Sequence, residues 1–361
     1  MITNIETCPQ AAAARAKTGA ARFYGQTEGR MKMESKVLFL NDQQVRSLLT
    51  QRDVLDIVEE TFTALGNGML RHPRKDPMFV DEEGRYNCLL AMPAQLKHKQ
   101  VAGMKWISMF SHQKPGLPSS FGNFVILNHT DTGAPFALVE ATSITLMRTG
   151  GGHAVIGAKH LAKKGACKLA VIGCGDEGRR AIGGFLEEFA LKELHLCDLS
   201  EAAMDRCIAE HSGRIEKIVK CASPREAVKG TDMVLTVTTS RKPLITADML
   251  EPGMTVLGLN AFNDLDGSLA DGRFRWILGN KHSDGSQIVD NPRFASAHLS
   301  MDNVSGDLGE ILTGKIPGRT SEDEVIVFTH MGMGSLDLAC ALVAYERAME
   351  KGIGQTLIFN G

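Results

Sequence analysis

The chain has 361 residues, of which 43% are hydrophobic and 23% charged, and its formal net charge at pH 7 is -2. This length is enough for two domains with cores of their own. The near-neutral charge gives no electrostatic basis for binding nucleic acid or an anionic membrane, and no apolar run is long enough to span a bilayer.

Residues 1–32 are rich in alanine, glycine and small polar residues, so we expect a flexible extension ahead of the folded part. The eight cysteines are scattered, with no CxxC pair and no grouping at metal-ligand spacing. Free thiols in a reducing compartment are the natural interpretation, so we expect a cytoplasmic protein without a metal site.

The first half of the folded part predicts helices and a mainly antiparallel sheet. A helical pattern at 53–65 is followed by short extended runs that are separated by turn signals such as Lys114-Pro115-Gly116. These runs lie at 87–91, 102–109, 123–127 and 136–140.

From about residue 168 onward, strand and helix patterns alternate. This alternation predicts a doubly wound parallel sheet of the Rossmann type over about 165–325, so the fold class is α/β with a separate α+β domain ahead of it. A final helix at 335–351 is expected to pack back on the first domain. The predicted strands of the parallel sheet are 169–172, 194–197, 215–221, 233–238, 255–259, 276–278 and 325–328.

A glycine-rich turn follows the first strand of this parallel sheet. Gly173, Gly175 and Gly178 have the spacing GxGxxG, and apolar residues at helical spacing come next. In this context the motif indicates a dinucleotide-binding turn. The first glycine allows the tight turn, the second lets backbone approach a pyrophosphate, and the third lets helix and strand pack closely. We expect the phosphates at the beginning of the following helix.

Asp198 ends the next predicted strand, about 20 residues after the glycine turn, where a carboxylate can accept hydrogen bonds from a ribose 2′-hydroxyl. Leu199 and Ser200 supply no arginine for a 2′-phosphate. The pattern therefore favours NAD over NADP, although an arginine from elsewhere in the fold would reverse that preference.

Three cationic residues of the first half lie in sequence contexts which suggest that the fold holds each charge in a defined position. Arg74 sits in a basic segment between prolines, Lys105 in an extended run, and Arg148 just before three glycines. Arginine pairs with a carboxylate through two parallel hydrogen bonds, and the pKa of lysine changes readily on burial. Together they could bind the carboxylate of an amino or keto acid. From spacing alone, however, three surface ion pairs are the simpler interpretation.

Short motifs recur in order along most of the chain. They are Met92-Pro93-Ala94, Gly103-Met104-Lys105, Gly116-Leu117-Pro118, Thr132-Gly133-Ala134-Pro135, Ile144-Thr145 with Arg148-Thr149, the glycine turn, Pro252-Gly253, Gly314-Lys315-Ile316-Pro317-Gly318-Arg319 and Asp337-Leu338-Ala339. With these motifs the chain resembles the ornithine cyclodeaminase/μ-crystallin family of NAD(P)-linked enzymes over about residues 36–355.

The resemblance implies a substrate-binding and dimerisation domain at 33–160, which the C-terminal segment 331–361 joins, and an NAD-binding Rossmann domain at 161–330. It also implies a homodimer. By resemblance, Lys105 and the two arginines hold the substrate carboxylate, and Lys105 lies near the reacting amine or water. The implied cofactor contacts are Gly173, Gly175 and Gly178, Asp176 and Glu177 in the phosphate turn, Asp198 at the ribose, Thr238 beside the nicotinamide, and Ser119.

The family's catalytic aspartate is harder to assign. Ornithine cyclodeaminases have a Pro-Gly-Lys element after the fifth Rossmann strand, and it is missing from 260–269 of this chain. Asp264 fits best if the loop is shortened, as in relatives that resemble the diaminopropionate-forming dehydrogenases, and Asp266 is second. The chain also departs from the family at Gly150-Gly151, where alanines are usual, and at His330, for which we favour a structural role over substrate contact.

These residues predict an NAD-dependent oxidoreductase that acts on the Cα amine or imine of a small amino acid, as an amino-acid dehydrogenase or an imine reductase. Two alternatives stay open. One is ornithine cyclodeaminase-type cyclisation with catalytic NAD, and the other is a μ-crystallin-like protein that binds a cofactor and a ligand without turnover.

Overall fold

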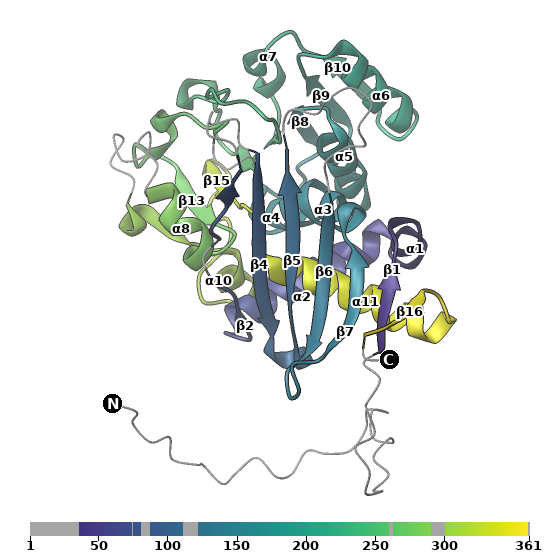
Figure 1. The fold of residues 1–361 in the computed structure, drawn as a ribbon. Helices are drawn as coiled ribbons and strands as arrows, with labels where there is room; N and C mark the ends of the chain where they lie inside the picture. The colour runs from purple at the N-terminus through teal and green to yellow at the C-terminus, as the bar shows by residue number, and fades with distance from the viewer. Residues whose placement is uncertain are drawn as a thin grey trace, which may run out of the picture.

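The computed structural model describes residues 36–73, 75–80, 87–110, 122–259, 263–289 and 300–359. Their strands form two eight-stranded sheets, which we call sheet A and sheet B (Figure 1). The fold is α/β, as the sequence predicts, with a parallel sheet in the middle of the chain and a mixed sheet built mainly from the first half.

Sheet B is the predicted parallel sheet. Its strand order is β10-β9-β8-β11-β12-β15-β13-β14, and its neighbouring strands run parallel. The order reverses direction between β8 and β11, and the carboxyl ends of all these strands meet at one edge. The strands are β8 (Lys168–Ile172), β9 (Glu193–Cys197), β10 (Lys217–Lys220), β11 (Met233–Thr236), β12 (Thr255–Gly258), β13 (Arg275–Leu278), β14 (Val304–Asp307) and β15 (Ile326–Thr329).

Sheet A runs in the order β16-β1-β7-β6-β5-β4-β2, with β3 also paired to β4. Its pairs are antiparallel except β1 with β7, so the prediction of a mainly antiparallel sheet is confirmed. The strands are β1 (Lys36–Leu40), β2 (Leu70–Arg71), β3 (Met78–Phe79), β4 (Cys88–Leu96), β5 (Val101–Met109), β6 (Asn123–His129), β7 (Pro135–Glu140) and β16 (Gln355–Ile358).

Helices connect and cover the two sheets. The α-helices are α1 (Asp42–Leu48), α2 (Gln51–Gly66), α3 (Thr142–Arg148), α4 (Val155–Leu161), α5 (Asp176–Glu188), α6 (Glu201–His211), α7 (Pro224–Val228), α8 (Lys281–Val289), α10 (Leu308–Leu312) and α11 (Gly334–Lys351). Short helices of other kinds are η1 (Lys97–Lys99), the π-helix η2 (Thr149–Ala154), η3 (Ala247–Met249), η4 (Gly267–Ala270) and η5 (Met301–Asn303). No helix in the described part of the chain is long and apolar enough to cross a membrane.

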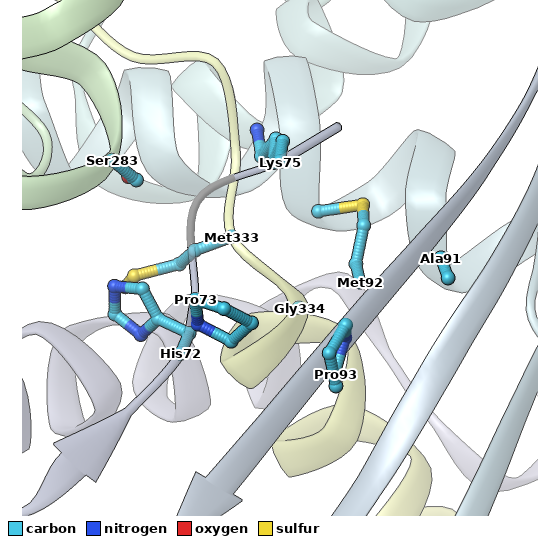
Figure 2. Close-up of a pocket in the computed structure, with 9 residues that line it drawn as sticks. All are labelled: His72, Pro73, Lys75, Ala91, Met92, Pro93, Ser283, Met333 and Gly334. Atoms are coloured by element: carbon cyan, nitrogen blue, oxygen red, sulfur yellow. The ribbon is translucent and has the colours of Figure 1, made fainter. Parts of the chain in front are cut away.

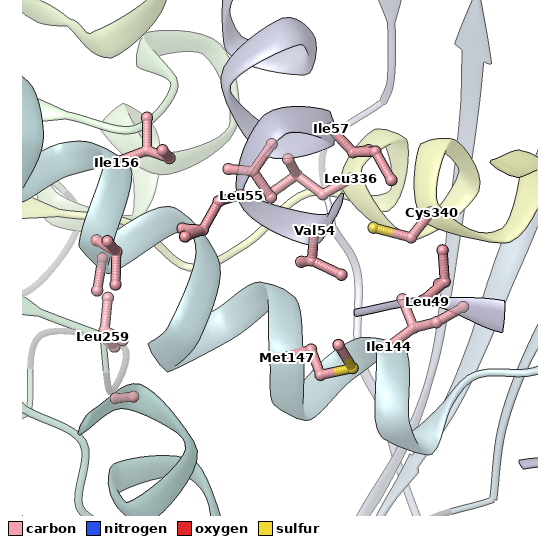
Figure 3. Packing of buried hydrophobic residues seen from close by; sticks show 14 of the residues in the cluster. Leu49, Val54, Leu55, Ile57, Ile144, Met147, Ile156, Leu259, Leu336 and Cys340 are labelled. Carbon is pink, nitrogen blue, oxygen red and sulfur yellow. The ribbon is translucent and has the colours of Figure 1, made fainter. Parts of the chain in front are cut away.

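The C-terminal helix α11 lies across sheet A, in contact with β4, β5, β6 and β7 (Figure 1). It ends at Gly352, whose φ of 64° is the left-handed conformation that favours glycine. Side chains from α2, α3, α4 and α11 pack together there, including Val54, Met147 and Leu336 (Figure 3). One apolar core therefore joins the first half of the chain to its last helix.

Helix α5 and the π-helix η2 approach each other through glycines. A Cβ added to Gly184 would lie 2.4 Å from the carbonyl oxygen of Gly151, and a Cβ added to Gly150 would lie 2.7 Å from the Cβ of Ala181. The two backbones are thus too close for larger residues. This contact brings the helix that follows the glycine turn against the segment that follows Arg148.

A pair of adjacent substitutions in α5 tests this contact. Gly184→Ala should lower the free energy of unfolding by about 1–3 kcal/mol, because its methyl group meets backbone that cannot yield. Gly183→Ala is the matched control, because the nearest atom to its added Cβ is 4.0 Å away, and it should raise stability by up to about 1 kcal/mol. Urea denaturation measures both changes. Equal effects of the two substitutions would contradict the close approach.

Candidate active site

Most polar residues predicted to carry function lie beyond the carboxyl ends of neighbouring strands of sheet B. The glycine turn follows β8, Thr238 follows β11, and Asp264 follows β12. These three strands are adjacent in the sheet. In open α/β sheets, ligands bind outside the carboxyl ends at the point where the strand order reverses, which here lies between β8 and β11.

The glycine turn has the shape that a dinucleotide pyrophosphate requires. Gly173 has a φ of +100°, and a Cβ on it would lie 2.4 Å from the carbonyl oxygen of Val237. A Cβ on Gly178 would lie 1.9 Å from the oxygen of Gly173, so helix and turn are packed tightly. Gly175, in contrast, faces open space and caps α5 without a side-chain hydrogen bond. The amide groups of the first turn of α5 are therefore available to an anion.

Asp198 turns its carboxylate toward this turn. Its Oδ2 accepts a hydrogen bond from the backbone nitrogen of Cys174 at 2.6 Å, and its Oδ1 accepts one from Ser200 at 2.8 Å. The side chain of Leu199 is fully exposed beside it. A ribose hydroxyl fits this position, and the two residues after Asp198 provide no cation for a 2′-phosphate.

Lys105, Arg148 and Asp337 form a buried group, which we call the cation cluster. Lys105 Nζ donates to Asp337 Oδ1 at 2.7 Å and to Thr145 Oγ1 at 2.6 Å, while Arg148 Nε donates to the same Asp337 oxygen at 3.1 Å. Lys105 and Asp337 are 0% exposed and Arg148 is 5% exposed. For Lys105 and Arg148, the interpretation as surface ion pairs is therefore wrong.

The cation cluster carries more positive than negative charge. Burial lowers the pKa of Lys105 to about 8, although Asp337 opposes this change. Burial alone would raise the pKa of Asp337, but Arg148 and Lys105 outweigh burial and lower it. Two cations thus share one carboxylate, and Asp337 Oδ2 has no hydrogen-bond partner within the described residues. A second carboxylate, brought by a ligand, would balance the charge.

Lys75 and the segment between β15 and α11 adjoin the cation cluster. Lys75 Nζ donates to the carbonyl oxygen of Met331, and burial lowers its pKa to about 8. A Cβ on Gly332 would lie 2.6 Å from Arg148 Nη1. Figure 2 shows Lys75 in the wall of a pocket with His72 and Met333 close together on one side. The pocket is lined by His72, Pro73, Lys75, Ala91, Met92, Pro93, Ser283, Met333 and Gly334.

Thr238 and Asp264 form a second polar group. Thr238 Oγ1 donates to Asp264 Oδ1 at 2.6 Å, and Asp264 is only 1% exposed. Asp266, the other candidate, accepts a hydrogen bond from the backbone nitrogen of Ser268 at 2.9 Å and caps η4. A capping role accounts for Asp266 without any chemistry. Of the two carboxylates, only that of Asp264 is held against the loop that follows β11.

Glu177 links the glycine turn to the cation cluster. It is partly buried in the first turn of α5, and burial raises its pKa although Arg148 and Lys105 oppose the rise. A Cβ on Gly150, two residues after Arg148, would lie 2.8 Å from the carbonyl oxygen of Glu177, so the segment after Arg148 contacts the first turn of α5. Asp176, the neighbouring residue, is exposed and pairs with Arg179 at 3.1 Å.

Two predicted site residues, Arg74 and Ser119, lie outside the described residues. Sequence reasoning missed Asp337 and Lys75 as functional residues. Asp337 was visible only as part of a family motif, and its position in the first turn of α11 was the available signal. Lys75 was not singled out, because the adjacent Arg74 was the residue assigned to the site.

Comparison with known proteins places the whole folded part in one family. The model of the ornithine cyclodeaminase/mu-crystallin family matches residues 35–352. An alanine dehydrogenase from Archaeoglobus fulgidus is 29% identical, over 90% of this chain and 99% of its own length. An N-((2S)-2-amino-2-carboxyethyl)-L-glutamate dehydrogenase from Staphylococcus aureus is also 29% identical, with the same shares of the two chains.

Two solved structures have a fold similar to that of this chain. An archaeal alanine dehydrogenase dimer with bound NAD has a TM-score of 0.81 and 26% identity, over 90% of this chain and 99% of that chain. The Thermococcus litoralis Delta(1)-pyrroline-2-carboxylate reductase, in complex with NADH and L-proline, has a TM-score of 0.80 and 26% identity, over 89% and 100% of the two chains. The relatives named here are thus amino-acid dehydrogenases and an imine reductase, and the two solved structures hold NAD or NADH.

Asp337→Asn tests the energetic weight of the cation cluster. The substitution leaves two buried cations without their charged partner, so it should lower the free energy of unfolding by about 3–5 kcal/mol. Asp131→Asn, in the exposed turn between β6 and β7, is the control and should leave stability unchanged. Urea denaturation at neutral pH measures both. A fully stable Asp337→Asn protein would show that the cluster is not held by this charge.

Proposed function

The chain belongs to the ornithine cyclodeaminase/mu-crystallin family, and on that premise we propose that it is an NAD-dependent oxidoreductase acting on the Cα amine or imine of a small amino acid. The observation that carries the proposal is the buried cation cluster with its unbalanced positive charge, next to a close contact between Gly150 and the carbonyl of Glu177 in the glycine turn's helix. In this proposal a carboxylate site and a dinucleotide site are therefore adjacent.

In this proposal Arg148 and Lys105 bind the substrate carboxylate, together with Arg74. Arg148 and Lys105 are held by Asp337 before substrate arrives. Fixed donors lose little freedom on binding, so the substrate is held in one orientation and its Cα is presented in one direction. We also assign to Lys105 the orientation of the reacting amine or of a water molecule.

A bound nicotinamide supplies hydride chemistry at the substrate Cα. The residues that would hold the cofactor are the glycine turn with Asp176 and Glu177, Asp198 at the ribose, Thr238 near the nicotinamide, and Ser119. We propose NAD rather than NADP, because Asp198 is followed by the exposed Leu199 and not by a cation.

Asp264 is the proposed acid and base. Its buried carboxylate, held by the Thr238 hydroxyl, accepts the proton of the substrate amine in oxidation and returns it in reduction. The negative charge also stabilises a neighbouring iminium carbon and nitrogen. We favour a dehydrogenase or imine reductase over a cyclodeaminase, because the loop at 260–269 lacks the Pro-Gly-Lys element of ornithine cyclodeaminases.

We also propose that the protein is a homodimer. The archaeal alanine dehydrogenase of similar fold is a dimer, and the first half of this chain carries the sheet that the resemblance assigns to dimerisation. Size-exclusion chromatography with light scattering would distinguish a dimer from a monomer.

The direct test is a screen of amino acids, keto acids with ammonia, and cyclic imines against NADH and NADPH. We expect turnover to change the absorbance of NADH at the nicotinamide band, with NADH preferred over NADPH. A product that forms without net change in NADH would instead indicate a cyclodeaminase. Tight binding of an apolar ligand without any turnover would overturn the enzyme proposal in favour of a ligand-binding protein.

Two substitutions separate the candidate catalytic aspartates. Asp264→Asn should lower kcat by at least about a hundredfold, because a general base of this kind contributes roughly that much or more. Asp266→Asn is the control and should keep most of the activity, since an amide can also cap η4. Steady-state kinetics on the best substrate of the screen decide between them. The reverse result would assign the chemistry to Asp266.

A further inference from the structure

A buried pair of histidines with an aspartate lies beside the cation cluster. His330, directly after β15, places its Nδ1 2.6 Å from Asp284 Oδ2, and both residues are 0% exposed. His153, in the π-helix η2, is 1% exposed, and its ring centroid is 4.6 Å from that of His330 in a T-shaped arrangement. We call Asp284, His330 and His153 the imidazole cluster. None of the roles proposed above uses it.

The ring of His330 occupies the space that a side chain at position 279 would fill. A Cβ on Gly279 would lie 2.1 Å from His330 Nδ1. Phe62 packs on another side of the ring, with centroids 5.4 Å apart. The fold brings His153 and His330 together from segments that are far apart in the sequence.

Three ring nitrogens of the imidazole cluster lack hydrogen-bond partners. Within the described residues, His330 Nε2 and both nitrogens of His153 are buried and unpartnered. If His330 Nδ1 donates its proton to Asp284, Nε2 carries a lone pair, and a neutral His153 offers one N–H and one lone pair. Buried polar groups are normally satisfied, so an unsatisfied group calls for an explanation. An additional proton would use one of these lone pairs.

The cations of the substrate site lie next to this cluster. The two residues after His330 contact them: the carbonyl of Met331 accepts from Lys75, and Gly332 lies against the Arg148 guanidinium. The charged groups that face the rings are therefore Asp284 from α8, Arg148 from α3 and Lys75 from the β2–β3 connection, with His72 nearby.

These surroundings lower the pKa of both rings and so disfavour the imidazolium form. Burial lowers the pKa of His330, and Lys75 and Arg148 lower it further, although Asp284 opposes them. Burial, His330, Arg148 and Lys75 together put the pKa of His153 well below its ordinary value. An anion bound to Arg148 offsets the repulsion of that cation, while the attraction of Asp284 remains.

We propose that the imidazole cluster takes up one proton when a carboxylate binds to the neighbouring cations. The proton enters at His330 Nε2 or His153, and Asp284 stabilises the resulting imidazolium. This inference rests on the proposed function only in placing a carboxylate at Arg148 and Lys105. Reduction of a neutral imine to an ammonium consumes one hydride and two protons, of which Asp264 supplies one in the proposed function, so the stored proton matches the other in number.

Calorimetric titration of oxalate into the NADH-loaded protein at pH 7 tests the proposal. Buffers of different ionisation enthalpy report the number of protons exchanged on binding. The wild-type protein should take up about one proton per site. His330→Gln and His153→Gln should each lose most of this uptake, and retained NADH affinity shows that each variant is folded. His129→Gln, at the exposed end of β6, is the control and should match the wild type.

Each other outcome overturns the proposal. Oxalate binding without proton uptake by the wild type, or uptake by both His330→Gln and His153→Gln that equals that of the wild type, assigns the cluster no proton-binding role. Absence of oxalate binding by the NADH-loaded protein removes the anion on which the uptake depends. The proposed function is tested separately. Turnover of amino acids without proton uptake on oxalate binding would support the proposed function and contradict this inference. Proton uptake without any turnover in the screen would do the reverse.

Discussion

The contact of Lys105 and Arg148 with one oxygen of Asp337 is the interaction on which the rest of the site depends. It joins β5 of sheet A, the end of α3 and the first turn of α11 through three buried side chains. Removal of Asp337 would leave both buried cations without their charged partner, whereas loss of either cation would still leave Asp337 paired with the other. The arrangement also explains why the last helix returns to the first half of the chain.

In the proposed function, the same arrangement binds the carboxylate of the substrate. Two cations and one carboxylate leave a positive charge that a substrate carboxylate can balance. The glycine contacts between α5 and η2 hold the phosphate turn against the segment after Arg148, so the cation cluster and the dinucleotide site keep a fixed relation. Thr238 and Asp264, at the carboxyl ends of neighbouring strands, complete the edge of sheet B at which the chemistry is proposed.

Local patterns predicted the parts of the fold that local physics determines. The glycine turn, the strand before it and the alternation of sheet B are encoded within short segments, and the structure contains them. Strands β1, β2, β3, β14 and β16 were missed, since each has two to five residues and β1 and β16 pair across almost the whole chain. Such pairing depends on the tertiary fold, which spacing does not reveal.

The candidate site was predictable only in part for the same reason. Lys105 and Arg148 could be singled out from their contexts, but their burial could not, because Asp337 lies 232 residues after Lys105. The meeting of His153 with His330 and Asp284 is likewise a product of topology, since η2, β15 and α8 are far apart in sequence. Arg74 and Ser119 fall outside the described residues, so their places in the site stay predictions.

Binding of a carboxylate to the NADH-loaded protein, compared between wild type and Arg148→Met, tests the central claim most directly. The claim predicts that Arg148→Met weakens oxalate binding by at least about tenfold, since a charge-assisted contact is lost, while the affinity for NADH stays the same. Equal oxalate affinity in the two proteins, with NADH binding intact in both, would contradict the claim and place the substrate carboxylate elsewhere.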